Sequence, residues 1–201
     1  MNGQETVYRR IACGFLDGEG SFTQLSLSKS LGLSLSTVNA AVVNLRDISA
    51  VRVKQRSFEV VAFDRLLLYW ATHRLLKKDI IYQTRVDMPV REIERSMPQE
   101  IAFTGYTAYR LIFKEAPADY SEVYVYATEP GLSIVKKRFP KNDKIPNVVV
   151  LKCDGNLKNA IEQGKLKHSS VCEAQVFVDL WNMGEWYAKD YVDALAKRVG
   201  I

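Results

Sequence analysis

The 201-residue sequence predicts an α+β protein in two parts, a mainly helical part over residues 1–78 and a sheet part over residues 79–201. Two observations lead to this prediction. Apolar residues recur at helical spacing up to a composition break at Lys77, Lys78 and Asp79, and short strand-like segments alternate with helical ones after it. The apolar fraction of 47% is ordinary for a globular protein, so a substantial core can form.

Residues 6–34 predict two helices and a tight turn. Thr6 can cap a first helix that ends among three glycines, at positions 14, 18 and 20. The leucines at positions 25, 27, 31 and 33 fit a short second helix and its exit turn. Gly32 can adopt the left-handed conformation that this turn requires, and Ser34 or Ser36 can cap the next helix. This pattern is typical of a helix-turn-helix.

The helix expected after this turn has an apolar face and a polar face. Four residues fall at positions i, i+3, i+4 and i+7 and should face the core, namely Val38, Ala41, Val42 and Leu45. The candidate DNA-binding residues fall largely elsewhere on the wheel: Ser36, Thr37, Asn39, Ala40, Asn44 and Arg46. Asn39 is the best candidate for reading adenine, because its amide both donates and accepts a hydrogen bond.

A basic hairpin is expected directly after this helix. Residues 51–54 alternate apolar and basic side chains, as a half-buried strand does, and residues 58–62 form the returning strand. The tip is expected at residues 55–57. Such a hairpin is the wing of a winged helix-turn-helix domain, and four of its side chains should meet phosphates or the minor groove: Arg52, Lys54, Gln55 and Arg56. The alternative is an ordinary solvated strand face.

The charge distribution favours a nucleic-acid partner for this first part. Residues 1–78 contain 11 Lys and Arg residues against 6 Asp and Glu residues, whereas residues 79–201 contain 17 of each. Basic charge attracts the phosphate backbone whatever its sequence. We therefore expect double-stranded DNA as the partner, although some winged helices bind RNA or protein instead. Because one such domain contacts little DNA, a homodimer on repeated or palindromic sites is a further expectation.

A fourth helix is expected over residues 65–76, with Asp64 as its cap. Its broad apolar face could join the two parts or form a dimer contact. His73 is expected to be an ordinary surface residue of this helix rather than a metal ligand.

The second part is predicted to mix strands and helices. Strands are expected over residues 80–86, 101–105, 122–128, 147–151 and 173–180. Helices are expected over residues 90–97, 106–113 and 185–199. The basic segment 130–146 is interpreted as a solvated loop or short helix, with a second DNA contact as the alternative. Together these elements predict an α/β sheet domain.

Composition argues against several other classes of protein. No apolar run approaches the roughly 20 residues that a membrane-spanning helix needs. The first residues lack the features of a signal peptide, so a cytoplasmic location without membrane contact is expected. Cys13, Cys153 and Cys172 are widely separated and odd in number, which favours three small buried side chains over a disulfide framework or a metal site. No cofactor is expected.

The helix-turn-helix is followed by Phe103–Ala108, Val123–Tyr126 and Gln175–Leu180, and this arrangement resembles the AbiEi-type antitoxins of type IV toxin–antitoxin systems. The resemblance implies a transcriptional regulator whose N-terminal domain binds DNA and represses its own operon. It also implies a nucleotidyltransferase-like C-terminal domain. This domain would oppose a nucleotidyltransferase toxin, through the toxin itself or its substrate.

The main alternative is an active nucleotidyltransferase, which would use Mg²⁺ and a nucleoside triphosphate. Such enzymes place serine after the glycine of a turn and two carboxylates on the following strand. Here Tyr106 follows Gly105, and residues 123–126 contain no carboxylate. Only Asp179 could supply the third carboxylate, and it could equally cap a turn or form a structural ion pair. The sequence therefore predicts no catalytic site.

Overall fold

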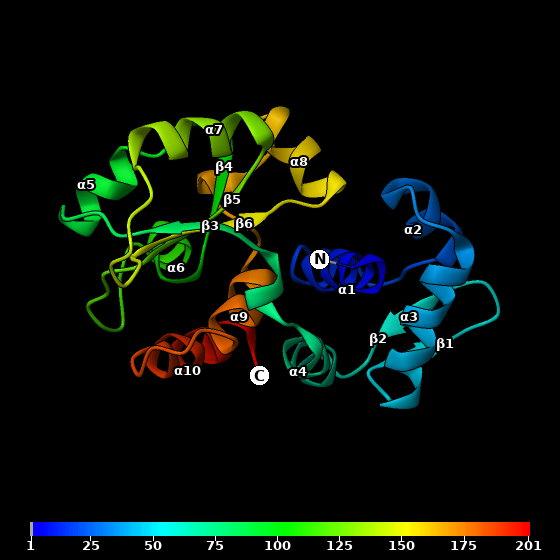
Figure 1. The fold of residues 1–201 in the computed structure, drawn as a ribbon. Helices are drawn as coiled ribbons and strands as arrows, with labels where there is room; N and C mark the ends of the chain where they lie inside the picture. The colour runs from blue at the N-terminus through cyan, green and yellow to red at the C-terminus, as the bar shows by residue number, and fades with distance from the viewer. Residues whose placement is uncertain (1) are drawn as a thin grey trace.

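The computed structural model describes residues 2–201 and has an α+β fold, in which helices accompany a mixed four-stranded sheet. Figure 1 shows the chain in two halves. Helices α1 to α4 and a small hairpin form the right-hand half. The sheet and the remaining helices form the left-hand half, and helices lie on both faces of the sheet. The predicted fold class is therefore confirmed at this level.

The first half contains four helices and one antiparallel hairpin. Its elements are α1 (Gly3–Leu16), α2 (Gln24–Leu31), α3 (Leu35–Asp47), β1 (Val51–Val53), β2 (Phe58–Val60) and α4 (Phe63–His73). Asn2 caps α1 by accepting a hydrogen bond from the Glu5 amide, so the expectation that Thr6 is the cap is wrong. Thr6 lies one turn inside the helix and is buried.

The turn between α2 and α3 agrees with the sequence. Gly32 ends α2 in the left-handed conformation, at φ 64°. Ser34 caps α3, because its hydroxyl accepts a hydrogen bond from the Thr37 amide at 3.1 Å. The four residues expected on the core face of α3 are all buried. This turn therefore sets α3 across the preceding helices with its opposite face exposed.

Helix α4 differs from its expected bounds at both ends. It begins at Phe63, and Asp64 lies in its first turn without capping it. It ends at His73, after which Arg74 adopts an extended backbone and a 3₁₀ helix, η1 (Leu76–Asp79), leads into the sheet. The change of direction places the Arg74 side chain inside the molecule rather than on a helix surface.

The second half is built around a sheet with strand order β3-β6-β5-β4. Strands β5 and β6 are parallel, and each edge strand is antiparallel to its neighbour. The strands are β3 (Ile80–Thr84), β4 (Ile101–Thr104), β5 (Val123–Ala127) and β6 (Val148–Lys152). The helices are α5 (Val90–Arg95), α6 (Gly105–Phe113), α7 (Glu129–Arg138), α8 (Gly155–Glu162), η2 (Lys167–Ser169), α9 (Glu173–Trp181) and α10 (Ala188–Val199).

Two sequence interpretations in this half need correction, and the structure decides between the alternatives left open for a third. Residues 173–180 form helix α9 rather than a strand, and Ala174 to Leu180 are all buried. A continuous apolar run does not distinguish a buried strand from a helix buried on all sides. Residues 129–138 form helix α7, capped by Thr128, so the short-helix alternative holds for that part of the basic segment. Helix α10 begins at Ala188, which leaves Trp186 outside it and 83% exposed.

A buried arginine joins the two halves. The side chain of Arg74 is 1% exposed, and its guanidinium contacts Asp179 on α9 at 3.2 Å and Glu5 on α1 at 3.0 Å. It also contacts Asp79 at 2.6 Å and donates to the Tyr126 hydroxyl on β5 at 2.9 Å. Burial alone would lower the pKa of Arg74, but Asp179, Tyr126 and Asp79 outweigh it and raise that pKa. The group therefore stays charged while buried.

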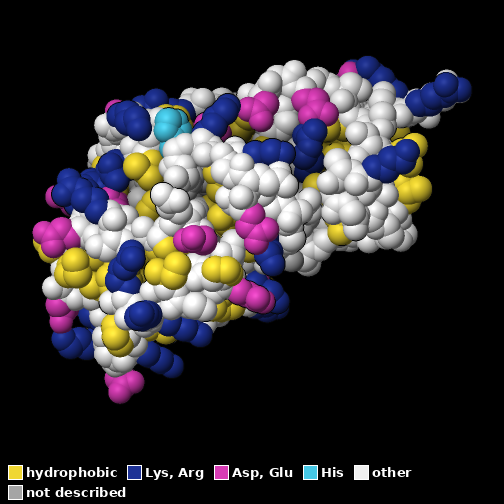
Figure 2. Space-filling view, turned by 90° about the horizontal axis from the view of Figure 1, so that it is seen from above, with side chains coloured by type: hydrophobic (Ala, Val, Ile, Leu, Met, Phe, Trp, Pro, Cys, Tyr) yellow, Lys and Arg dark blue, Asp and Glu magenta, His cyan; other side chains and the backbone are white. Residues whose placement is uncertain are grey.

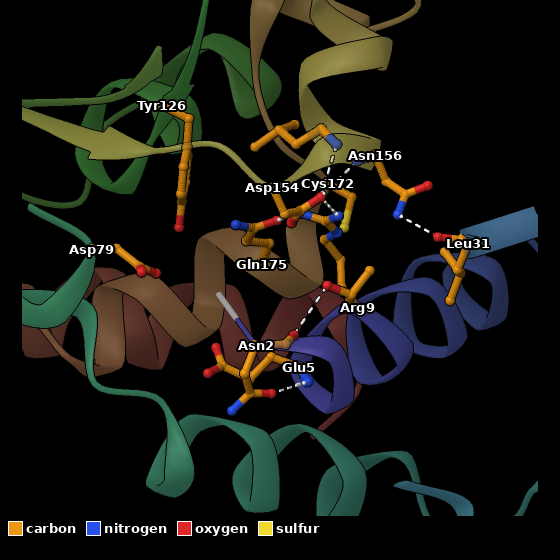
Figure 3. Close-up of polar contacts among 12 residues, drawn as sticks. Asn2, Glu5, Arg9, Leu31, Asp79, Tyr126, Asp154, Asn156, Cys172 and Gln175 are labelled. Carbon is orange, nitrogen blue, oxygen red and sulfur yellow. Dashed lines mark hydrogen bonds and ion pairs between the residues drawn. The ribbon is translucent and has the colours of Figure 1, made fainter. Parts of the chain in front are cut away.

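Further contacts cross the same joint, as Figure 3 shows. Arg9 on α1 reaches between elements of the sheet half and pairs with Asp154 through contacts of 2.8 and 2.7 Å. The Asn156 amide donates to the Leu31 carbonyl at 3.2 Å. A disulfide joins Cys13 on α1 to Cys172 before α9, contrary to the expectation of three unpaired cysteines. The two partners are 159 residues apart, so their spacing gave no sign of the bond.

We expect Arg74→Leu to lower the free energy of unfolding by about 3–5 kcal/mol, because it leaves the fully buried Asp179 carboxylate without its cation. Urea unfolding followed by circular dichroism measures the change. Arg65→Leu is the control, since Arg65 is exposed on α4 and loses only an exposed hydrogen bond to the Ile48 carbonyl, so this change should cost little. Equal losses in the two variants would show that the Arg74 ion pairs do not stabilise the joint.

Candidate nucleic-acid interface

The side of α3 opposite its core face is open to solvent. Leu35, Ser36, Asn39 and Arg46 are exposed on this helix, and Val43 is half-buried. This arrangement follows from the sequence, because the buried positions recur at helical spacing and leave one continuous outer face. We call the face formed by Leu35, Ser36, Asn39, Val43 and Arg46 the outer face of α3.

The polar groups at the start of this face are available for binding. Asn39 forms no side-chain hydrogen bond with the residues that the structure describes, so both atoms of its amide are free. The Ser36 hydroxyl lies 2.8 Å from the Ser34 hydroxyl and is exposed. An unpaired amide on a helix surface can donate and accept at once, which is the pattern that an adenine edge requires.

Three of the candidate residues on α3 do not lie on the outer face. Thr37 is half-buried, its hydroxyl lies 2.8 Å from that of Ser34, and its methyl group lies beside Gly3 of α1. Asn44 is half-buried and donates to the Tyr8 hydroxyl at 3.0 Å, so it packs against α1. Ala40 is half-buried as well. The expectation that Thr37 and Asn44 point outward is corrected, since the α1 side of the helix is covered.

The Tyr8–Asn44 contact is a partly buried structural hydrogen bond. Tyr8 is 2% exposed, and burial raises the pKa of its hydroxyl to about 12, although the hydrogen bond with Asn44 opposes that rise. Because the hydroxyl oxygen is buried, it needs a hydrogen-bond donor inside the protein. Asn44 supplies it, which fixes α3 against α1.

Arg52 and Lys54 lie on the same side of the hairpin, where they share one carboxylate. In its register Arg52 is paired with Glu59, and both Arg52 and Lys54 contact the Glu59 carboxylate, at 3.4 and 2.6 Å. The hydrogen bond from Lys54 is the main reason that the pKa of Glu59 is lowered. One carboxylate therefore neutralises part of the charge of the hairpin, which the sequence interpretation did not include.

The tip of the hairpin carries one cation, Arg56, that has no partner among the described residues. Lys54, Gln55 and Arg56 are exposed there, and the Lys54 amide donates to the Ser57 carbonyl at 2.7 Å to close the turn. Arg56 makes no ion pair or hydrogen bond with residues 2–201. Arg46 at the end of α3 is exposed and pairs with its neighbour Asp47 at 2.9 Å.

Sequence reasoning missed the apolar part of this surface. Leu35, which the sequence interpretation assigned to neither face, is 49% exposed, and Val53, expected on the apolar side of the half-buried strand, is 48% exposed. Only the capping role of Ser34 could have indicated Leu35, because it places Leu35 in the exposed first turn of α3. Next to its turn, the hairpin is held by Phe58, which pairs with Val53, forms a β-bridge with Phe22 and stacks on its ring. A single bridging residue leaves no pattern in the sequence.

Asp179, the carboxylate considered for nucleotidyltransferase chemistry, makes structural contacts instead. Asp179 lies on α9 with no exposed surface, and its carboxylate binds Arg74, the Thr104 hydroxyl at 2.7 Å and the Tyr126 hydroxyl at 2.8 Å. Of the alternatives for Asp179, the structural ion pair is the one observed. Within residues 2–201, no three His, Cys, Asp or Glu side chains are grouped so as to hold a metal ion.

Comparisons with models of protein families, with curated proteins and with solved structures found no match for this chain. Over the part of the chain that the structure describes, every helix is too short or too polar to span a membrane.

We expect Asn44→Ala to lower the free energy of unfolding by about 1 kcal/mol, because the buried Tyr8 hydroxyl loses its partner. Asn39→Ala on the same helix removes an amide that binds nothing within the described residues, so it should change stability by less than about 0.5 kcal/mol. Urea titrations of both variants test the assignment. If Asn39→Ala proves the more costly change, the two sides of α3 have been assigned the wrong way round.

Proposed function

We propose that this chain is a transcriptional regulator that binds double-stranded DNA through a winged helix formed by α1, α2, α3 and the β1–β2 hairpin. The observation that supports it most directly is the combination of an exposed helix face carrying Ser36 and Asn39 with an adjoining hairpin whose cations project from the molecule. In this arrangement α3 enters the major groove near its N-terminal end, and the hairpin contacts the backbone or minor groove.

We assign each exposed side chain a role according to the part of the DNA that it can contact. Asn39 and Ser36 read base edges, because their polar groups are exposed at the start of α3. Leu35 offers an apolar contact of the kind that a thymine methyl group accepts. Arg52, Lys54 and Arg56 neutralise phosphates and position the helix without reading sequence.

Glu59 reduces the positive charge of the hairpin but leaves Arg52 and Lys54 able to bind phosphate. The carboxylate shares Arg52 and Lys54 through contacts at an exposed strand, where ion pairs are weak and exchange readily. A phosphate can therefore replace Glu59 as the partner of either cation. Arg56 needs no such exchange, since it has no partner within the described residues.

The finer proposal, an autorepressing antitoxin of a type IV toxin–antitoxin system, rests on the resemblance of residues 103–108, 123–126 and 175–180 described above. Its partner would be a nucleotidyltransferase toxin or that toxin's substrate. A reading frame for such a toxin next to the gene would support this role, and an isolated gene would leave the proposal at a DNA-binding regulator.

We expect replacement of Arg52, Lys54 and Arg56 by alanine to weaken binding to every duplex and to flatten its salt dependence. Each lost phosphate contact should reduce the slope of log K against log salt by about one unit. Fluorescence anisotropy with a labelled duplex at several salt concentrations measures both effects. Glu59→Gln is the matched control and should strengthen binding, because it frees two cations. Unchanged affinity in the triple variant would remove the hairpin from the interface.

We expect Asn39→Ala to relax base preference at one position of the binding site by roughly 1–3 kcal/mol, since it removes a bidentate contact. Selection of preferred duplexes from a random pool, followed by sequencing, compares the motifs of wild type and variant. Asn44→Ala serves as the control, because Asn44 contacts Tyr8 rather than solvent. An unaltered motif in Asn39→Ala would exclude Asn39 as a reader.

A further inference from the structure

Two tryptophans lie exposed where α9 turns into α10. Trp181 is 45% exposed and Trp186 is 83% exposed, and both line a hollow of about 410 Å³ together with Met183 and Val192. We call these four residues, of which the two tryptophans are exposed, Val192 is half-buried and Met183 is buried, the tryptophan face. Grouped exposed apolar side chains mark interaction sites in soluble proteins, and tryptophan is enriched in protein–protein interfaces. The third tryptophan, Trp70, differs from these two, because it is fully buried in the core.

The apolar surface extends beyond this turn. Helix α4 adjoins the end of α9, because the Asn182 amide donates to the Ala71 carbonyl at 3.0 Å. Leu68 on α4 is 38% exposed, and Leu75, in the short segment between α4 and η1, is 54% exposed. The exposed apolar residues therefore belong to two adjoining elements rather than to one isolated side chain.

The charges at the rim allow this surface to meet a copy of itself. Glu185, Lys189 and Asp193 line the same hollow, and Lys189 pairs with Asp193 at 2.7 Å. Both signs are present, so a second copy is not repelled. The opposite side of the molecule, where α5 and α7 lie in Figure 1, differs, since Figure 2 views that side and shows many Lys and Arg side chains on its left-hand part. The last turn of α7 alone contains three cations, Lys136, Lys137 and Arg138, and like charges there would oppose self-association.

We propose that the tryptophan face binds a second copy of this chain to form a two-fold symmetric dimer. In Figure 1, α4 and α10 lie along the lower side of the molecule, whereas α3 and the hairpin form its right-hand end. A two-fold axis running along the lower side leaves both right-hand ends pointing the same way, as two half-sites on one duplex require. The choice of a second copy rests on the proposed function, because a single winged helix covers little DNA.

Sedimentation velocity on the full chain without DNA, from about 1 to about 100 µM, tests the dimer. We expect wild type to dimerise and Trp186→Ser to weaken dimerisation by at least about tenfold, as the loss of a central tryptophan does at protein interfaces. Ile145→Ser is the matched control, since Ile145 is 84% exposed away from this face and should dimerise as wild type. Thermal unfolding monitored by circular dichroism establishes that both variants are folded.

Intrinsic fluorescence gives a second readout. Because Trp70 is already buried, a shift of emission to shorter wavelength with rising concentration reports the burial of Trp181 and Trp186. A monomer over the whole concentration range, or a folded Trp186→Ser variant that dimerises as tightly as wild type, would overturn the proposal. Both measurements omit DNA. A tryptophan-dependent dimer that binds no duplex would therefore refute the proposed function alone, and a DNA-binding monomer would refute this inference alone.

Discussion

The burial of Arg74 is the constraint on which the arrangement of the two halves depends. A guanidinium cannot leave water without charged and polar partners, and here those partners come from α1, α9, η1 and β5. Moving any of these elements away from Arg74 would break one of its contacts and expose part of the cluster to water. Asp179 is equally dependent, because it has no exposed surface and binds Arg74, Thr104 and Tyr126 at once. The two halves are therefore held in one relative orientation by a polar cluster as well as by apolar packing.

Helix α1 connects the Arg74 cluster to the candidate interface, because it contacts both. One side of α1 contributes Glu5 and Arg9 to the joint, and the same helix contributes Tyr8 to the contact with Asn44 on α3. The direction of α3 relative to the sheet half is thus set through a single intervening helix. The disulfide from Cys13 to Cys172 reinforces the same path. In the proposed regulator, this rigidity means that the spacing of two recognition helices in a dimer would be fixed by the fold rather than by a flexible linker.

Local signals in the sequence were sufficient for the turn between α2 and α3, for the core face of α3 and for most strands. Gly32, Ser34 and the four buried positions of α3 are decided by neighbours in the chain, so capping and periodicity identify them. Residues 173–180 could not be assigned in this way, because a segment buried on all sides shows no periodicity. Thr37 and Asn44 were placed outward for a related reason. A helical wheel shows which residues share a face, but it does not show that α1 covers the flank on which these two lie.

Long-range ion pairs also change how the net positive charge of residues 1–78 should be interpreted. The excess of Lys and Arg in residues 1–78 includes Arg9 and Arg74, which pair across the joint with Asp154, Asp79 and Asp179 of the other half. These two cations balance carboxylates inside the molecule and contribute little to an external field. The net charge of a segment therefore overstates its attraction for phosphate when its partners lie elsewhere in the chain. What favours DNA binding here is where the remaining cations project, and Arg52, Lys54 and Arg56 do so from a hairpin beside the exposed face of α3.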